Sequence, residues 1–248
     1  MKVGSLFSGI GGFDLGLERA GFEISWQVEI DDYCRRVLRK HWPNVRRYED
    51  IRGIDWSTVE PIDLLCGGFP CQDLSFAGKR AGIDGERSGL WSEFVRAIRA
   101  LRPRYVIVEN VPGLLTNPYM GRVLGDLAAC GYDAEWDCLS AQVFGLPHRR
   151  TRVWIVAYPK QNRSGFLLFS SSHHFQSCSR SVQATSCAAD ISAWNREEVC
   201  PPKSIRVVDG IPNELDACRF GQLGNAIVPQ IAEALGRMIL EADHAGRG

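Results

Sequence analysis

The sequence predicts an α/β fold, a doubly wound and mostly parallel sheet with helices on both faces. Short apolar runs alternate with helical stretches from residue 1 to about residue 157, and a glycine-rich turn follows the first run. This alternation is typical of parallel sheets whose crossover helices cover both faces. The chain has 248 residues, of which 45% are hydrophobic, so it can bury a large core.

The apolar runs and the helical stretches give the expected elements in order. The run Tyr105–Val108 is the clearest apolar run and predicts a strand that is buried on both faces. Pro103 ends the preceding helix, because proline cannot continue a helix. Apolar residues at three- and four-residue steps predict a terminal helix over 227–242. We expect strands over 3–7, 22–28, 62–65, 105–108, 132–138 and 152–157, and helices over 13–20, 31–41, 90–101 and 120–129.

The alternating pattern stops near Tyr158 and Pro159. Residues 164–192 are rich in serine, with scattered histidine, cysteine, alanine and glutamine, and they show no convincing periodicity. Such a composition predicts a loop-rich insert. The terminal helix then restores a regular pattern after this insert.

The overall charge does not indicate a nucleic-acid partner, because 29 basic and 29 acidic side chains give a net charge of zero. Basic clusters within 35–47, 96–104 and 148–152 are local, and such runs are usually solvated faces. We expect no signal peptide and no membrane span, since no apolar run is long enough for one. The nine cysteines of the chain include no Cys-x-x-Cys pair, so we expect a cytoplasmic protein with free thiols. We expect no metal site, since the following residues match no common zinc spacing: His173, His174, Cys178 and Cys187.

Cys71 is the leading candidate for a nucleophile. It lies in Phe69-Pro70-Cys71-Gln72, which follows an apolar run and two glycines. This arrangement places a thiol on a loop at the carboxyl edge of the predicted sheet, where open α/β folds bind ligands. A lone cysteine is more often a small buried hydrophobic residue, so its companions elsewhere in the chain decide the interpretation.

Polar residues end other predicted strands at the same edge. Glu109 ends the most apolar strand, and Arg150 and Arg152 alternate where the chain becomes extended, so both would point to one face. The turn Phe7–Gly12 suits a close approach of a ligand to the backbone, although its spacing is not Gly-x-Gly-x-x-Gly. Glu29 follows the second strand, where an acidic residue would meet ribose hydroxyls. Asp50 is a similar candidate for an adenine amino group.

Five segments of the chain, taken in order, resemble the motif set of C5-cytosine DNA methyltransferases of the bacterial and phage type. They are the turn at 7–12, Pro70-Cys71-Gln72, Glu109-Asn110-Val111, Arg150-Thr151-Arg152 and Gly224-Asn225-Ala226. The resemblance implies a Rossmann-like fold that uses S-adenosylmethionine (SAM). It also implies a catalytic domain over 1–158, a reduced target-recognition insert over 159–205, and a segment over 206–248 that returns to the catalytic domain.

The resemblance implies a role for each site residue. Cys71 would add to C6 of a cytosine flipped out of DNA, so that C5 takes the methyl group of SAM and S-adenosylhomocysteine leaves. Glu109 would hold the N3 and amino edge, Arg152 the base carbonyl, and Arg150 a phosphate or the catalytic loop. The cofactor residues would be Phe7, Gly9, Gly11, Gly12, Glu29, Asp50, Ile51, Pro70, Leu90, Asn225 and Ala226. The DNA-binding residues would be Gln72, Ser75 and Arg149.

The short insert is the main departure from the family, because such enzymes usually carry a substantial recognition region there. His148 also occupies a position where glutamine is expected in many relatives. Three alternatives remain open: a tRNA cytosine-5 methyltransferase, a catalytically impaired methyltransferase that only binds DNA, and a nicotinamide-dependent oxidoreductase, which the glycine spacing disfavours. We expect a monomer that acts on double-stranded DNA in a restriction-modification system, away from membranes, with a cognate restriction enzyme or a specificity partner.

Overall fold

The computed structural model describes residues 1–70, 89–116, 118–146, 150–160 and 226–245. The strands are β1 Lys2–Leu6, β2 Glu23–Val28, β3 Arg46–Tyr48, β4 Leu64–Gly67, β5 Tyr105–Asn110, β6 Tyr132–Ser140 and β7 Thr151–Pro159. The α-helices are α1 Gly12–Ala20, α2 Asp32–His41, α3 Leu90–Leu101, α4 Tyr119–Ala129 and α7 Pro229–Ala245. Short 3₁₀ helices are η1 Ile51–Gly53, η2 Trp56–Thr58, η3 Pro112–Leu115 and η4 Ala141–Phe144.

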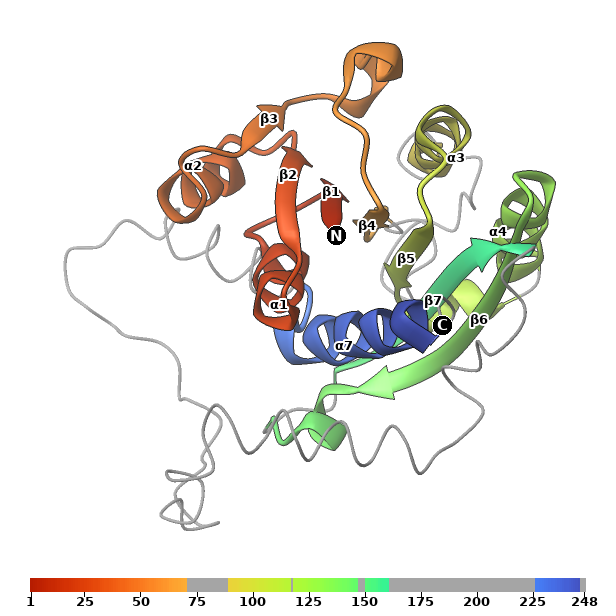
Figure 1. Ribbon diagram of the computed structural model, residues 1–248. Helices are drawn as coiled ribbons and strands as arrows, with labels where there is room; N and C mark the ends of the chain where they lie inside the picture. Colours follow the sequence, from red (N-terminus) through yellow and green to blue (C-terminus); the bar gives the residue numbers. More distant parts are fainter. Residues whose placement is uncertain (71–88, 117, 147–149, 161–225, 246–248) are drawn as a thin grey trace, which may run out of the picture.

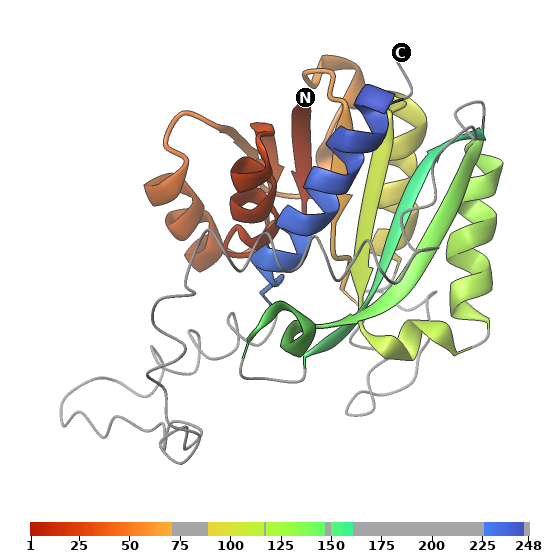
Figure 2. The same ribbon diagram turned by 60° about the horizontal axis from the view of Figure 1, so that its bottom comes forward.

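The strands form one seven-stranded sheet in the order β3-β2-β1-β4-β5-β7-β6 (Figure 1). Neighbours from β3 to β5 are parallel, whereas β7 runs antiparallel to both β5 and β6. Two hydrophobic clusters sandwich the sheet: α3 and α4 pack on one face, and α1 and α7 pack on the other (Figure 2). The predicted doubly wound α/β fold is therefore confirmed.

One strand prediction needs correction, and one strand was not predicted. The strand expected over 62–65 begins at Leu64 and extends to Gly67, because Gly67 still pairs with Leu6 and Val108 on the neighbouring strands. The short strand β3 was not expected, since its three residues are polar and lie partly in solvent. It joins the sheet only by pairing beside β2. Pro159, the first residue of the predicted insert, still belongs to β7, and residues 161–205 of the insert lie outside the described residues.

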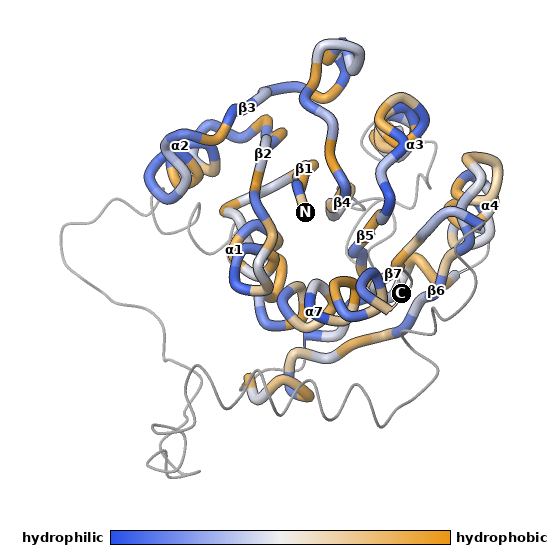
Figure 3. Tube along the Cα trace, viewed as in Figure 1, coloured by the Kyte–Doolittle hydropathy of each residue, from blue (hydrophilic) through white to orange (hydrophobic). Residues whose placement is uncertain are grey.

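Hydropathy separates the helices that the sheet buries from those it leaves in solvent. Figure 3 contrasts the mostly hydrophilic α2 with α7, along which hydrophobic residues recur. Only Cys34 and Leu38 of α2 are buried, whereas nine residues of α7 are. None of the helices in the described ranges is both long and apolar enough to cross a membrane.

Glycines bring α7 directly against α1. A Cβ atom on Gly16 would lie 2.3 Å from the carbonyl oxygen of Pro229, and one on Gly236 would lie 2.9 Å from Cβ of Ala20. Only glycine allows this approach of the two helices. At the far end of α7, the buried carboxylate of Asp243 pairs with Arg104 and accepts a hydrogen bond from the Tyr105 hydroxyl at 3.2 Å.

The domain boundaries expected at residues 158 and 205 stay predictions, since most of the chain around them lies outside the described residues.

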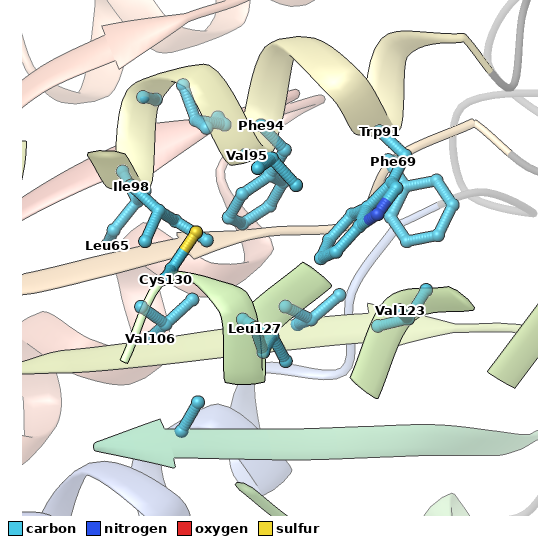
Figure 4. Close-up of a cluster of buried hydrophobic side chains, with 14 of the residues drawn as sticks. Leu65, Phe69, Trp91, Phe94, Val95, Ile98, Val106, Val123, Leu127 and Cys130 are labelled. Carbon is cyan, nitrogen blue, oxygen red and sulfur yellow. The ribbon is translucent and has the colours of Figure 1, made fainter. Parts of the chain in front are cut away.

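Aromatic side chains fill the core beneath the end of β4. The ring of Phe69 lies 5.1 Å from that of Trp91, which in turn lies 5.5 Å from that of Phe94. Figure 4 shows Phe69 and Trp91 together at one end of this cluster. The indole N–H of Trp91 donates to Asp126 at 2.9 Å, which fixes the ring. Phe69 is therefore held in place immediately before Pro70.

Candidate active site at the carboxyl edge of the sheet

The carboxyl ends of the parallel strands collect the polar side chains that the sequence singled out. Glu29 directly follows β2, and Glu109 lies near the end of β5. Because β7 runs antiparallel to β5, its first residues come to the edge where β5 ends, and Val153 pairs with Asn110. The opposite strand directions therefore bring Arg152 to Glu109.

Glu109 and Arg152 form a buried ion pair at this edge. Nε of Arg152 lies 3.2 Å from Oε1 of Glu109, and the two side chains are only 20% and 9% exposed. Burial raises the pKa of Glu109 to about 7, while the charges of Arg152 and Arg150 act in the opposite direction. A carboxyl group of this kind exchanges a proton near neutral pH, so it can donate or accept a hydrogen bond.

The Glu109 carboxylate keeps free hydrogen-bonding capacity. Its Oε1 atom is buried and accepts no hydrogen bond from the described residues, despite its charge contact with Arg152. A Cβ atom on Gly68 would lie 2.9 Å from Oε2 of Glu109 and 3.4 Å from Cδ1 of Ile227. Glycine thus leaves room beside the carboxylate. Oε1 thus has a charge contact but no hydrogen bond from the described chain, so it can accept one from a ligand.

Asn110 fixes the chain that leads to Cys71. Its side-chain amide donates to the carbonyl oxygen of Phe69 at 3.2 Å, and its Oδ1 accepts from the N–H of Val111 at 2.8 Å. Phe69 is therefore held by both its ring and its carbonyl group. The sequence analysis quoted Asn110 only within a motif and gave it no role.

The glycine-rich turn adopts left-handed backbone conformations. Phe7, Gly9 and Gly11 have φ values of 52°, 56° and 90°. The N–H of Gly9 donates to Oε2 of Glu29 at 2.7 Å, and the N–H of Asp31 donates to Oε1 at 2.8 Å. Burial raises the pKa of Glu29, while these backbone N–H groups lower it. The two backbone N–H groups thus hold the Glu29 carboxylate beside the turn.

The glycines of this turn differ in what their missing side chains would meet. A Cβ atom on Gly9 would have no atom of the described residues within 4 Å, so Gly9 is not crowded by that part of the chain. On Gly11 it would lie 2.4 Å from the ring of Trp42, and on Gly12 2.4 Å from the carbonyl oxygen of Ile227. Gly11 and Gly12 therefore admit neighbouring parts of the protein, and only their backbone can line a ligand.

The residues of the expected adenine region, Asp50 and Ile51, form hydrogen bonds with other protein groups. Both oxygens of Asp50 contact the Arg52 side chain, and Oδ1 also accepts its backbone N–H. These hydrogen bonds lower the pKa of Asp50. The Ile51 side chain is buried, and its carbonyl oxygen accepts from Arg96 at 2.9 Å. The described contacts of these two residues are thus with protein.

Ile30 is another residue at this edge to which the sequence analysis gave no role. It directly follows Glu29 and is 63% exposed, the largest value among the exposed large hydrophobic residues of the described chain. An isoleucine between a strand-end carboxylate and a helix start was the available signal.

A hollow of about 240 Å³ lies between the start of α7 and the start of β7. Both Ala226 and Arg150 line it, although they are far apart in the chain. Burial and the neighbouring Arg152 lower the pKa of Arg150, while Glu109 raises it. The residues that line the hollow are Leu146, Arg150, Ala226, Ile227, Val228, Pro229 and Gln230.

Residues 1–198 of the chain match the family of C-5 cytosine-specific DNA methylases. The chain belongs to this family. The match covers most of the chain, including the glycine turn, Glu109 and Arg152, which the structure gathers at one edge of the sheet.

Two type II methyltransferases show how far the likeness of this methylase extends. It is 42% identical over 167 residues to M2.BsuMI of Bacillus subtilis (strain 168), a match that covers 63% of this chain and 42% of the relative. It is 38% identical over 160 residues to M.NgoFVII of Neisseria gonorrhoeae, covering 62% and 43%. The chain thus spans about two fifths of the length of these curated relatives.

Solved structures agree on the fold. A structure described as that of a DNA modification methyltransferase encoded within an E. coli prophage is 30% identical, with a TM-score of 0.56 over 65% of this chain and 47% of its own. DNMT2 of Spodoptera frugiperda has the same TM-score at 21% identity, over 66% and 52%. At that identity the likeness shows the fold alone.

The methylase structure gathers some predicted site residues and leaves others undescribed. Glu109, Arg150 and Arg152 interact electrostatically with one another, and Gly9 bonds to Glu29. Pro70 and Leu90 are half-buried at the end of β4 and the start of α3. The predicted residues that lie outside the described part of the chain are Cys71, Gln72, Ser75, Arg149 and Asn225.

Proposed function

We propose that this methylase transfers a methyl group from SAM to C5 of a flipped-out cytosine in double-stranded DNA. The observation that carries the proposal is the buried Glu109–Arg152 pair at 3.2 Å, on the edge toward which Phe69 and Pro70 lead the chain. The family match and the type II relatives support the reaction class. They favour DNA over the tRNA and nicotinamide alternatives.

The paired side chains match the polar edge of cytosine. With a pKa near 7, Glu109 donates to the ring nitrogen N3 in its acid form, while its other oxygen accepts from the amino group. Arg152 donates to the base carbonyl, and Arg150 binds a phosphate or the catalytic loop. These groups stabilise the negative charge that develops on the ring when a nucleophile adds.

Cys71 supplies that nucleophile. Its thiolate sulfur bonds to C6, which leaves electron density at C5 for attack on a methyl group. Loss of the C5 proton to a water molecule and cleavage of the sulfur–C6 bond then restore the aromatic ring of 5-methylcytosine within the DNA and free the thiolate. Phe69, fixed by Trp91 and Asn110, positions the start of the Cys71 loop.

The residues around the glycine turn fit SAM, whose chemistry when bound is that of an electrophilic methyl donor. Glu29 offers a preset carboxylate for ribose hydroxyls. The described residues do not crowd Gly9, and exposed Ile30 offers an apolar surface beside the carboxylate for a flat heterocycle. The remaining cofactor contacts that we propose are made by Phe7, Gly11, Gly12, Asp50, Ile51, Pro70, Leu90, Asn225 and Ala226.

The likeness to type II methyltransferases supports a place in a restriction-modification system, with a cognate restriction enzyme or a specificity partner. We further propose that the protein acts as a monomer, and that Gln72, Ser75 and Arg149 contact the DNA.

A methyl-transfer assay tests the proposed function. The purified protein is incubated with SAM that carries a labelled methyl group, and with either mixed-sequence duplex DNA or tRNA. We expect label in DNA cytosine, its loss in Cys71→Ser, and its retention in Cys138→Ser, because Cys138 is an exposed free cysteine on β6. Label in tRNA alone would contradict the DNA assignment, and full activity of Cys71→Ser would contradict the nucleophile.

A further inference from the structure

A row of polar side chains crosses the sheet beneath the glycine turn. Ser5 of β1 pairs in register with Gln27 of β2 and with Cys66 of β4. The carboxylate of Asp14, on the first turn of α1, accepts from the Ser5 hydroxyl at 3.2 Å and from the Gln27 amide at 2.8 Å. Asp14, Ser5, Gln27 and Cys66 are all 0% exposed, in a layer that is otherwise hydrophobic.

Stability alone does not account for this carboxylate. Burial raises the pKa of Asp14 to about 6, and the hydrogen bonds from Gln27 and Ser5 offset only part of that effect. Apolar side chains of similar volume often stabilise such a position as well or better. The network is therefore a candidate for a role other than stability.

The network leads directly to the predicted cofactor residues. The carbonyl oxygen of Ser5 accepts from the Ser8 hydroxyl at 3.1 Å, and the N–H of Ser8 donates to the carbonyl oxygen of Val28 at 3.1 Å. Ser8 immediately precedes Gly9, and Val28 immediately precedes Glu29. Asp14 thus ties the first turn of α1 to both strands that carry the Gly9–Glu29 contact.

We propose that Asp14 is a positioning residue for the SAM site. It fixes the first turn of α1 against the ends of β1 and β2, and so sets the place of the Gly9 N–H relative to the Glu29 carboxylate. This inference rests on the proposed use of SAM. Hydrogen bonds have preferred directions, so the polar network constrains the register of the turn more closely than apolar packing in its place would.

The test measures SAM affinity by calorimetry and stability by thermal unfolding for matched variants. Asp14→Leu is expected to weaken SAM binding by about tenfold or more, because small displacements at a site lose large factors. Asp14→Asn keeps an acceptor for Gln27, and the Ser5 hydroxyl can turn to accept from its amide. It should bind SAM within about threefold of the wild type.

Two controls separate positioning from stability. The first is Asp243→Asn, which alters a buried carboxylate on the same face of the sheet that binds Arg104 and Tyr105. It should lower the melting temperature without weakening SAM binding. The second combines Asp14→Leu with Ser5→Ala and Gln27→Met, so that no polar partner stays unsatisfied. It should recover stability but not SAM affinity.

The outcomes are distinct. If the triple variant bound SAM as the wild type does, Asp14 would be merely structural and the inference would fail. Wild-type affinity in a folded Asp14→Leu protein would also overturn it. A wild-type protein that does not bind SAM would instead overturn the proposed function. In steady-state assays, the positioning role predicts a raised KM for SAM with kcat nearly unchanged.

Discussion

Two carboxylates lie at the same edge of the sheet, Glu109 buried and Glu29 partly buried, and they are held in opposite ways. Each oxygen of Glu29 accepts a backbone N–H, from Gly9 and from Asp31. Glu109 instead lies beside two arginines, and its Oε1 accepts no hydrogen bond from the described chain. The first carboxylate is fixed by the fold before any ligand binds, whereas the second keeps capacity for a reacting partner. On this difference we propose constant recognition for Glu29 and chemistry for Glu109.

Replacing Glu109 with glutamine should give the largest effect. Methyl transfer to DNA is expected to fall by about 10²–10³, since the residue stabilises charge that develops during the reaction. SAM affinity should stay within about twofold, because the altered group contacts the base and not the cofactor. Single-turnover kinetics and calorimetry check the two parts. A comparable loss of SAM affinity would erase the distinction between the two carboxylates.

The pH dependence of stability should report Glu109 separately. Its pKa is raised from 4.5 to about 7 in the folded protein, so the folded state binds more protons than the unfolded state in that range. Stability contributed by the protonated form is therefore lost as pH rises from about 4.5 to 7. Relative to Glu109→Gln, the wild type should lose up to roughly 3 kcal/mol across this window.

Urea unfolding of both proteins at several pH values measures this difference. Asp14 and Glu29 titrate in both proteins and cancel in the comparison. A difference that does not change with pH would contradict the raised pKa of Glu109.

Replacing Glu29 with alanine should weaken cofactor binding and leave the chemical step unchanged. Loss of a charge-assisted hydrogen-bond acceptor is expected to weaken SAM binding by about 10- to 100-fold. At saturating SAM, kcat should change little. Glu23→Ala, which removes an exposed carboxylate at the start of β2, provides the matched control and should have no effect. Equal SAM affinity in Glu29→Ala and the wild type would remove the proposed ribose contact.

The smallest effects concern the helix that supports the cofactor side. Gly16→Ala should destabilise the protein by about 1–3 kcal/mol, because its Cβ would lie 2.3 Å from the Pro229 carbonyl oxygen. Gly125→Ala is the control: it lies on α4, and no atom of the described residues lies within 4 Å of the new Cβ. It should stabilise by about 0.4–1 kcal/mol. Thermal unfolding distinguishes them, and equal effects would argue against close α1–α7 packing.

Much of the fold could be predicted because the decisive signals are local. The apolar run of β5 and the helical period of α7 each lie within a few consecutive residues. The alternation of Arg150 and Arg152 was also visible. That β7 pairs antiparallel to β5, and so carries Arg152 to Glu109, depends on a contact between distant segments. The strand order that creates it is not encoded in any single motif.

The supporting residues were harder to predict than the reacting ones. Asp14 has the polar character expected of a residue on an exposed helix face, and only its alignment with Ser5 and Gln27 shows that it is buried. Asn110 likewise acquires its role from a carbonyl group 41 residues away. Such contacts depend on tertiary structure, which local patterns do not report.

Covalent trapping tests the central claim most directly, that Cys71 attacks a cytosine held by Glu109 and Arg152. The protein is incubated with SAM and duplex DNA that carries 5-fluorocytosine in random contexts. With fluorine at C5 in place of hydrogen, no proton can be removed there, so the sulfur–C6 bond persists. The account predicts a denaturation-resistant complex in the wild type and in Cys138→Ala, and none in Cys71→Ala. A SAM-binding protein that traps no DNA, or a Cys71→Ala variant that still does, would contradict it.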